Sequence, residues 1–287
     1  YFEVADEKNQ KFYTEKYGVT HPTKPGLKIP QMFEAAIDKE LKGLWIIGED
    51  IVQTDPNSAH VVEAMNSLEL LVVQEIFMSE TAKLATVVLP GTTFLEKDGT
   101  FTNTERRIQR VNRAVEPLPG TKPDGLIVTE MMKKLGFDQP TYDADQVLSE
   151  IADVVPFFKG VTRERLGKLG LQWPVQEDGT DTQILHTETF KLGKGQLKNF
   201  DWKESTEIEE NQKDYPLILT TSRVLQHYNA ATMTRRTKNI NIVDEDVLLI
   251  HPKDAAHRDI NTGDIGRLYS GRGEVALKVE VTDKVKE

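Results

Sequence analysis

The chain has 287 residues, which is enough for a large hydrophobic core and indicates two domains. Hydrophobic residues make up 38% and charged residues 29%, as in globular proteins. With 36 Lys and Arg against 46 Asp and Glu, the formal net charge is -10, which argues against a nucleic-acid-binding surface. No apolar run approaches the roughly 20 residues of a membrane-spanning helix, so we expect no membrane span.

Cysteine is absent, which excludes disulfides, iron–sulfur ligands and a cysteine nucleophile within this chain. The 6 histidines include no pair at the i, i+4 spacing of a helical metal site. We therefore expect no metal held by these side chains alone. The chain opens on Tyr1 with neither a start methionine nor a signal peptide, so we expect it to be part of a longer polypeptide.

The first half alternates between apolar runs and amphipathic stretches. Short runs closed by polar residues predict buried strands over residues 44–47, 70–73 and 86–89. Apolar residues at helical spacing predict helices over residues 32–42, 58–68 and 80–84. Strands that alternate with helices predict an open parallel α/β sheet with crossover helices.

Polar or glycine-containing loops follow the predicted strands, and ligands of such sheets bind outside the carboxyl ends of the strands. Asp50 is one candidate, because a carboxylate can accept two parallel hydrogen bonds from guanine. It could equally be a turn or capping aspartate. Thr54, Gln74 and Asp124 lie in neighbouring loops and could complete a purine or sugar pocket.

The stretch 91–109 is rich in glycine and threonine and predicts an irregular loop and a hairpin. It ends near the adjacent Arg106 and Arg107. Adjacent strand residues point to opposite faces, so at most one of these arginines faces the crevice, where phosphate or an acidic substrate would suit it. Both could also be solvated strand charges.

Further helices are predicted over 125–135, after Asp143 or Asp145, and after Thr162. We expect a cofactor-binding α/β domain over 1–173, an extended connection over 174–213, and a partial β-barrel over 214–287 that includes a strand at 217–219. Directly after that strand, residues 220–229 combine hydroxyl, guanidinium, imidazole, phenol and amide groups, which favours ligand contact over a purely structural role. Dinucleotide, P-loop and hydrolase-elbow motifs are absent.

Several segments together resemble the molybdopterin oxidoreductase family, and within it the catalytic α subunits of formate dehydrogenases. They include LWIIGEDIVQTD from Leu44, EKDGTFTNTERRIQR from Glu96 and PLILTTSRVLQHYNAATMTRR from Pro216. They lie in family order and cover most of the chain. Nitrate reductases carry loops similar to the second segment, so a sister molybdoenzyme such as an assimilatory nitrate reductase is an alternative.

The resemblance implies a molybdenum or tungsten ion held by two molybdopterin guanine dinucleotides. It places the α/β crevice on one guanosine end and residues 220–228 near the pterins. Gly48 would allow close approach of the cofactor. The implied cofactor-binding residues are Gly48, Asp50, Thr54, Gln74, Asp124, Arg223, His227 and Tyr228. Asn103 and Arg106 belong to the signature loop without an assigned role.

The family's metal-bound Cys or selenocysteine and its 4Fe-4S cluster ligands lie upstream of these residues. We therefore expect no catalytic residue and no metal ligand here, and an inactive chain when it is alone. The expected partners are the rest of the same polypeptide and electron-transfer subunits, in the cytoplasm. A stand-alone nucleotide-binding module, or a barrel that serves only as an interaction domain, are the alternatives outside this family role.

Overall fold

The computed structural model describes residues 1–287 except 1–2, 4, 191, 204 and 207–210. The chain divides into two compact units: residues 1–73, 80–87 and 230–287 form the first, and residues 74–79 and 88–229 the second. Within the described residues, none of the helices combines the length and apolar character that a bilayer crossing requires. The predicted domain boundaries at residues 173 and 213 stay predictions.

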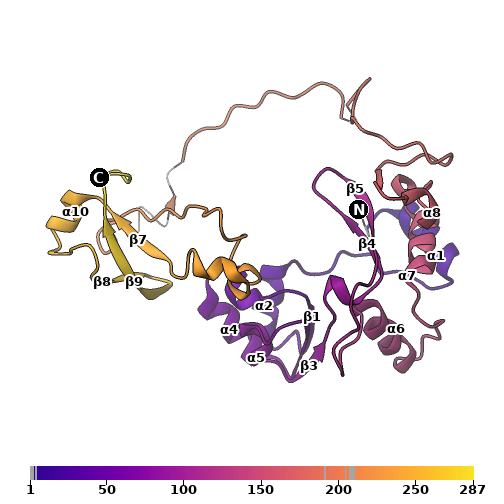
Figure 1. The fold of residues 1–287 in the computed structure, drawn as a ribbon, viewed down its shortest axis with the longest axis horizontal. Coiled ribbons are helices and arrows are strands. Elements are labelled where there is room, and N and C mark those ends of the chain that lie inside the picture. Colours follow the sequence, from indigo (N-terminus) through magenta and orange to yellow (C-terminus); the bar gives the residue numbers. More distant parts are fainter. Residues whose placement is uncertain (1–2, 4, 191, 204, 207–210) are drawn as a thin grey trace. The chain divides into compact units, whose positions relative to one another are not determined.

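A three-stranded sheet in the order β1-β2-β3 confirms the predicted α/β region (Figure 1). Its strands are β1 (Gly43–Ile47), β2 (Leu70–Glu75) and β3 (Val87–Pro90). The intervening helices are α3 (Ile51–Thr54), α4 (Ser58–Ser67) and α5 (Glu80–Lys83). Amides of Thr86 and Gly91 donate to the carbonyls of Leu71 and Glu75 at 2.8 and 3.0 Å, so β2 and β3 run in the same direction.

The burial pattern along β2 explains why the strand packs in the sheet and shows where a polar residue enters its buried part. Leu71 and Val73 alternate on the buried face, as an apolar strand requires. Gln74 breaks that alternation, because it is fully buried directly after Val73. A buried amide at the end of a strand needs hydrogen-bond partners from neighbouring chain or from a ligand.

The first unit also contains helices before the sheet and a second sheet near the C-terminus. The helices are α1 (Glu7–Tyr17) and α2 (Ile29–Ile37), of which α2 contacts α4. Strands β7 (Val247–Ile250), β8 (Ile265–Ser270) and β9 (Gly273–Val281) pair in the order β7-β9-β8, with α10 (Pro252–Ala256) after β7. Short 3-10 turns span Thr234–Arg236 and Lys238–Asn241.

The C-terminal sheet differs in part from the predicted barrel. The described residues form three strands rather than a closed barrel, with β7 parallel and β8 antiparallel to β9. The strand predicted at 217–219 is not formed. Ile250, Ala255 and Val279 make a small core, whereas Val275 is exposed, so the period-two pattern of β9 buries only its later part.

The second unit joins a hairpin to three helices. Its strands are β4 (Gly99–Thr102), β5 (Arg107–Val111) and β6 (Leu171–Gln172), all antiparallel. Its helices are α6 (Asp124–Lys134), α7 (Ala144–Val154) and α8 (Arg163–Leu166), with 3-10 turns at Phe94–Glu96 and Pro156–Phe158. Asp143 and Thr162 cap α7 and α8 through their side chains, as predicted.

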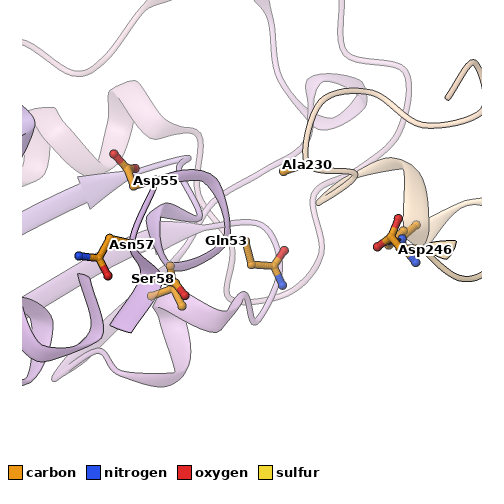
Figure 2. Close-up of a pocket in the computed structure, with 8 residues that line it drawn as sticks. Gln53, Asp55, Asn57, Ser58, Ala230 and Asp246 are labelled. Atoms are coloured by element: carbon orange, nitrogen blue, oxygen red, sulfur yellow. Dashed lines mark hydrogen bonds and ion pairs between the residues drawn. The ribbon is translucent and has the colours of Figure 1, made fainter. Parts of the chain in front are cut away.

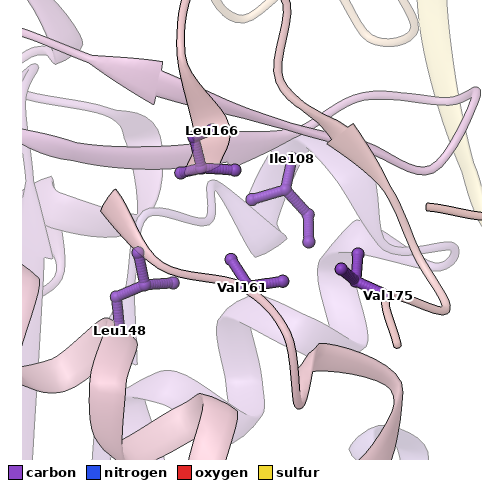
Figure 3. Packing of buried hydrophobic residues seen from close by; sticks show 5 residues of the cluster. All are labelled: Ile108, Leu148, Val161, Leu166 and Val175. Carbon is purple, nitrogen blue, oxygen red and sulfur yellow. The ribbon is translucent and has the colours of Figure 1, made fainter. Parts of the chain in front are cut away.

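The core of the second unit is a compact group of aliphatic side chains contributed by β5, α7, α8 and the loops beside them (Figure 3). Its buried members are Ile108, Leu148, Val161, Leu166 and Val175. Because these residues come from segments far apart in the sequence, the group ties the hairpin to the helices.

Replacement of Ile108 by alanine tests that core. Ile108 is 0% exposed. Its truncation should lower the free energy of unfolding by about 2–5 kcal/mol through lost burial and the cavity left behind. Gln109→Ala, at the exposed neighbouring position, should change stability by no more than about 0.5 kcal/mol. Urea unfolding of both variants measures the difference, and equal midpoints would contradict this account of the core.

Candidate functional site

The turn between β1 and α3 holds three of the predicted residues. Gly48 has a φ of 63°, a backbone conformation that favours glycine. Thr54 is exposed and ends α3, where its amide donates to the Asp50 carbonyl at 3.0 Å. Gly48, Asp50 and Thr54 therefore belong to one short turn that follows a strand, as the sequence predicts.

Asp50 is 8% exposed and its carboxylate is already hydrogen-bonded. Oδ1 accepts from the amide and the hydroxyl of Thr81 at 3.0 and 2.7 Å, and Oδ2 accepts from the Glu80 amide at 3.4 Å. The Thr81 hydroxyl oxygen in turn accepts from the Val52 amide at 3.1 Å. Asp50 therefore joins the β1 loop to the first turn of α5.

A polar hollow of about 510 Å³ lies beside this turn in the first unit (Figure 2). Its lining residues are Val52, Gln53, Asp55, Asn57, Ser58, Ala230, Arg235 and Asp246. Arg235 pairs with Asp246 at 2.9 Å and donates to the Asp244 carbonyl at the same distance. None of these residues was predicted as part of the site from the sequence, although Gln53 and Asp55 flank Thr54.

Gln74 and Asp124 are brought together in the second unit. The Gln74 amide nitrogen donates to Asp124 Oδ1 at 2.8 Å, and Lys97 Nζ donates to Asp124 Oδ2. We refer to Gln74, Lys97 and Asp124 as the Asp124 cluster. Lys97 was not predicted as a site residue, although its position in the signature loop was a signal for it.

Close packing surrounds the Asp124 cluster. A Cβ at Gly91 would lie 3.2 Å from Asp124 Oδ1, so the glycine lets the chain pass close to the carboxylate. A Cβ at Gly125 would lie 2.1 Å from the Tyr142 ring, so that ring rests on the backbone of α6. Lys97, Asp124 and Tyr142 line a hollow of about 260 Å³ together with the hairpin and α7.

Two buried polar atoms beside the cluster lack a hydrogen-bond partner. Gln74 Oε1 and Thr92 Oγ1 belong to residues that are 0% and 1% exposed. A buried polar atom without a partner costs free energy that a bound ligand could recover. This place at the ends of β2 and β3 is therefore suited to a ligand with polar hydrogens.

Electrostatics keep Asp124 charged. Burial raises the pKa of its carboxyl, but hydrogen bonds from Lys97 and Gln74 and the Lys97 charge outweigh that effect, so the pKa is lowered. Burial, with the charges of Asp124 and Asp143, raises the pKa of Tyr142. At neutral pH the Asp124 carboxylate is therefore charged and the Tyr142 phenol is neutral.

The predicted residues of 220–228 lie in a segment without regular structure. Arg223 donates to the Asn229 side chain at 2.9 Å. His227 is half-buried, and Tyr228 is exposed. The Arg223 guanidinium thus bonds within its own segment.

Arg106 of the signature loop forms its hydrogen bonds with the protein's own backbone. It adopts a φ of 67°, and its guanidinium donates to the carbonyls of Trp173, Thr182 and Gln183, the last two at 3.0 and 2.9 Å. It also lies 5.6 Å from the centre of the Trp173 ring. Arg107 pairs with Glu105 at 2.9 Å. Arg106 thereby holds the chain that leaves β6.

Family models match both ends of the chain. Residues 8–134 match the molybdopterin oxidoreductase model, and residues 217–287 match the molydopterin dinucleotide binding domain. The chain belongs to the molybdopterin oxidoreductase family. The Asp124 cluster and the β1–α3 turn lie within the first match, and Arg223, His227 and Tyr228 lie within the second.

The relatives within the family are longer than this chain. The chain is 40% identical to the F420-dependent formate dehydrogenase subunit alpha of Methanocaldococcus jannaschii over 98% of its own length and 42% of that protein. It is 40% identical to the probable oxidoreductase YjgC of Bacillus subtilis over 100% of its length and 29% of that protein. This chain therefore spans less than half of these relatives.

A solved structure supports the family fold. Acetylene hydratase from Pelobacter acetylenicus superposes with a TM-score of 0.66 at 21% sequence identity. The match covers 96% of this chain and 40% of that protein. At this identity the similarity describes the fold alone.

Asp50→Ala should destabilise the molybdopterin oxidoreductase chain by about 1–3 kcal/mol, because three donors at α5, the two of Thr81 buried, lose their acceptor. Asp50→Asn should lose less stability than Asp50→Ala, since the oxygen of the asparagine amide can still accept a hydrogen bond. Glu49→Ala, at the exposed preceding position, is the matched control and should have little effect. Chemical unfolding measures all three. An Asp50→Ala variant as stable as the control would contradict the capping role.

The stability that the Asp124 cluster contributes should depend on pH. The folded-state pKa of Asp124 lies below its ordinary value of 3.8, so the Lys97 pair contributes stability near neutral pH. That contribution should be lost as the pH falls below 3.8 through the folded-state pKa. Lys97→Met should therefore lower stability at pH 7, with a difference from the parent that shrinks in acid.

Lys122→Met is the control for this pH experiment, because it removes the more exposed Lys122–Glu130 pair. Urea unfolding at several pH values compares the two variants. A Lys97→Met deficit that stays constant down to pH 2 would show that the Asp124 charge is not involved.

Proposed function

We propose that this chain is the cofactor-binding portion of the catalytic α subunit of a formate dehydrogenase. The supporting observation is the Asp124 cluster at the carboxyl ends of neighbouring strands, in which Gln74 Oε1 has no hydrogen-bond partner among the described residues. The relatives named formate dehydrogenase supply the substrate class. A molybdopterin cofactor accords with both family matches.

The residues present fit a guanine dinucleotide end of that cofactor. Gln74 Oε1 could accept a hydrogen bond from the N–H groups of guanine, and Thr92 Oγ1 could accept or donate one. Lys97 offers a positive charge to phosphate, partly neutralised by Asp124. In the whole enzyme the bound bis-molybdopterin guanine dinucleotide, with molybdenum or tungsten, would supply the redox chemistry.

The other predicted residues have supporting roles in this proposal. Asp50 would fix the shape of the β1–α3 turn, because its oxygens already hold α5. Gly48 and Thr54 would present that turn to the nucleotide. Arg223, His227 and Tyr228 would contact the pterin end, since they lie in the matched dinucleotide-binding domain. None of these residues would take part in bond making or breaking.

The rest of the machinery would lie elsewhere. With no cysteine in this chain, a 4Fe-4S cluster and a metal-bound Cys or selenocysteine require other parts of the same polypeptide. Electron-transfer subunits would complete the assembly in the cytoplasm. A sister molybdoenzyme such as nitrate reductase is the alternative, and assays of the full-length protein with formate and with nitrate distinguish the two.

Gln74→Leu in the full-length protein tests the binding role. Leucine has a similar size but cannot hydrogen-bond, so cofactor affinity should fall by about tenfold or more. Gln109→Leu, on the exposed face of the hairpin, is the control. Molybdenum or tungsten content and released guanine nucleotide are measured, with circular dichroism as the check on folding. Undiminished content of both in a folded Gln74→Leu enzyme would refute the assignment.

A further inference from the structure

Residues 192–203 carry large apolar side chains that nothing in the described structure covers. Leu192, Leu197, Phe200 and Trp202 are 92%, 102%, 88% and 88% exposed. We call this stretch the 192–203 segment. The other two tryptophans, Trp45 and Trp173, are partly buried, so Trp202 stands apart from them. Clustered exposed aromatic and aliphatic side chains mark interaction surfaces.

The backbone of the segment is equally open. It contains no helix or strand and runs as an extended stretch of chain (Figure 1). Phe200 and Trp202 are two residues apart, which places side chains of an extended chain on the same side. Extended segments of this kind bind by adding to a sheet edge or lying in a groove, with alternate side chains in pockets.

The charge of the segment also differs from the rest of the chain. Lys194, Lys198 and Lys203 are opposed only by Asp201, which gives +2 within a chain of net charge -10. A flexible linker would consist mainly of small polar residues, not of four large apolar ones. An apolar groove with an acidic rim is the complementary surface.

The longer relatives offer a place for that groove outside residues 1–287. The segment falls between the two family-model matches, at 8–134 and 217–287. The Methanocaldococcus relative matches 98% of this chain, yet the chain covers only 42% of that protein. Most of such a polypeptide therefore lies outside these residues and is covalently tethered to the segment, which raises its effective concentration.

We propose that the 192–203 segment docks onto the part of the same polypeptide that lies outside residues 1–287, with Phe200 and Trp202 as its buried anchors. This inference rests on the proposed function only in requiring that the chain belong to a longer catalytic subunit. The docked segment would fix the connection between the two cofactor-binding regions. A large aromatic side chain in a pocket commonly dominates such an interface.

Photo-cross-linking in the full-length protein tests which part of the polypeptide the 192–203 segment contacts. With Phe200 replaced by p-benzoylphenylalanine, irradiation and peptide mass mapping should give an adduct with residues of the same polypeptide outside 1–287, at monomer mass. An adduct with a second copy, with another subunit or within residues 1–287 would overturn the proposal, as would the absence of any adduct. Molybdenum and guanine content of the same sample reports separately on the proposed function.

Tryptic cleavage supplies the second measurement. Docking should protect the bonds after Lys198 and Lys203 in the full-length protein, and Trp202→Ser should speed their cleavage by about tenfold or more. Gln196→Ser, an exposed polar position in the same segment, is the matched control and should leave the rate unchanged. Equal cleavage rates in the parent and Trp202→Ser would overturn the proposal.

Discussion

The hydrogen bond between Gln74 and Asp124 is the contact on which the candidate site depends. It joins residues 50 positions apart, at the end of β2 and the start of α6, and Lys97 adds a positive charge on the other carboxylate oxygen. It also orients the Gln74 amide, which leaves Oε1 buried without a partner. The protein therefore bears the cost of an unpaired acceptor at the place where a ligand would supply the donor.

Carboxylates elsewhere in the strand-end loops hold the backbone in shape. Asp50 accepts from Glu80 and Thr81, and Glu96 accepts from the amides of Thr93 and Leu118 at 2.8 and 2.9 Å. The Thr93 and Leu118 amides and the Thr93 hydroxyl lower the pKa of Glu96, so it stays charged. Irregular loops pre-organised by their own acidic residues suit binding, because less conformational entropy is lost when a ligand arrives.

Local patterns predicted the strands of the first sheet and the caps at Asp143 and Thr162, because apolar runs and capping side chains act over a few residues. Helix α1 was missed, since it buries no residue and rests on its Asp6 cap and the left-handed Gly18 at its end. The strand predicted at 217–219 is absent although its residues are apolar. A strand needs a neighbour to pair with, and that depends on distant chain. Lys97 and Tyr142 were missed for the same reason, because only the fold brings them to Asp124.

The signature loop shows why a motif is a better guide to fold than to ligand contact. The Asn103 side chain accepts from the amides of Glu105 and Arg107, both at 3.0 Å, and so builds the turn. The Arg106 guanidinium donates its hydrogen bonds to backbone carbonyls of the same chain. Lys97 and Asp98 of that loop line the hollow beside Asp124, and Lys97 pairs with the Asp124 carboxylate. An arginine of a signature loop can thus be required by the backbone, whereas a lysine of the same loop is the residue that could meet the ligand. Contacts in the folded chain are what separate the two roles.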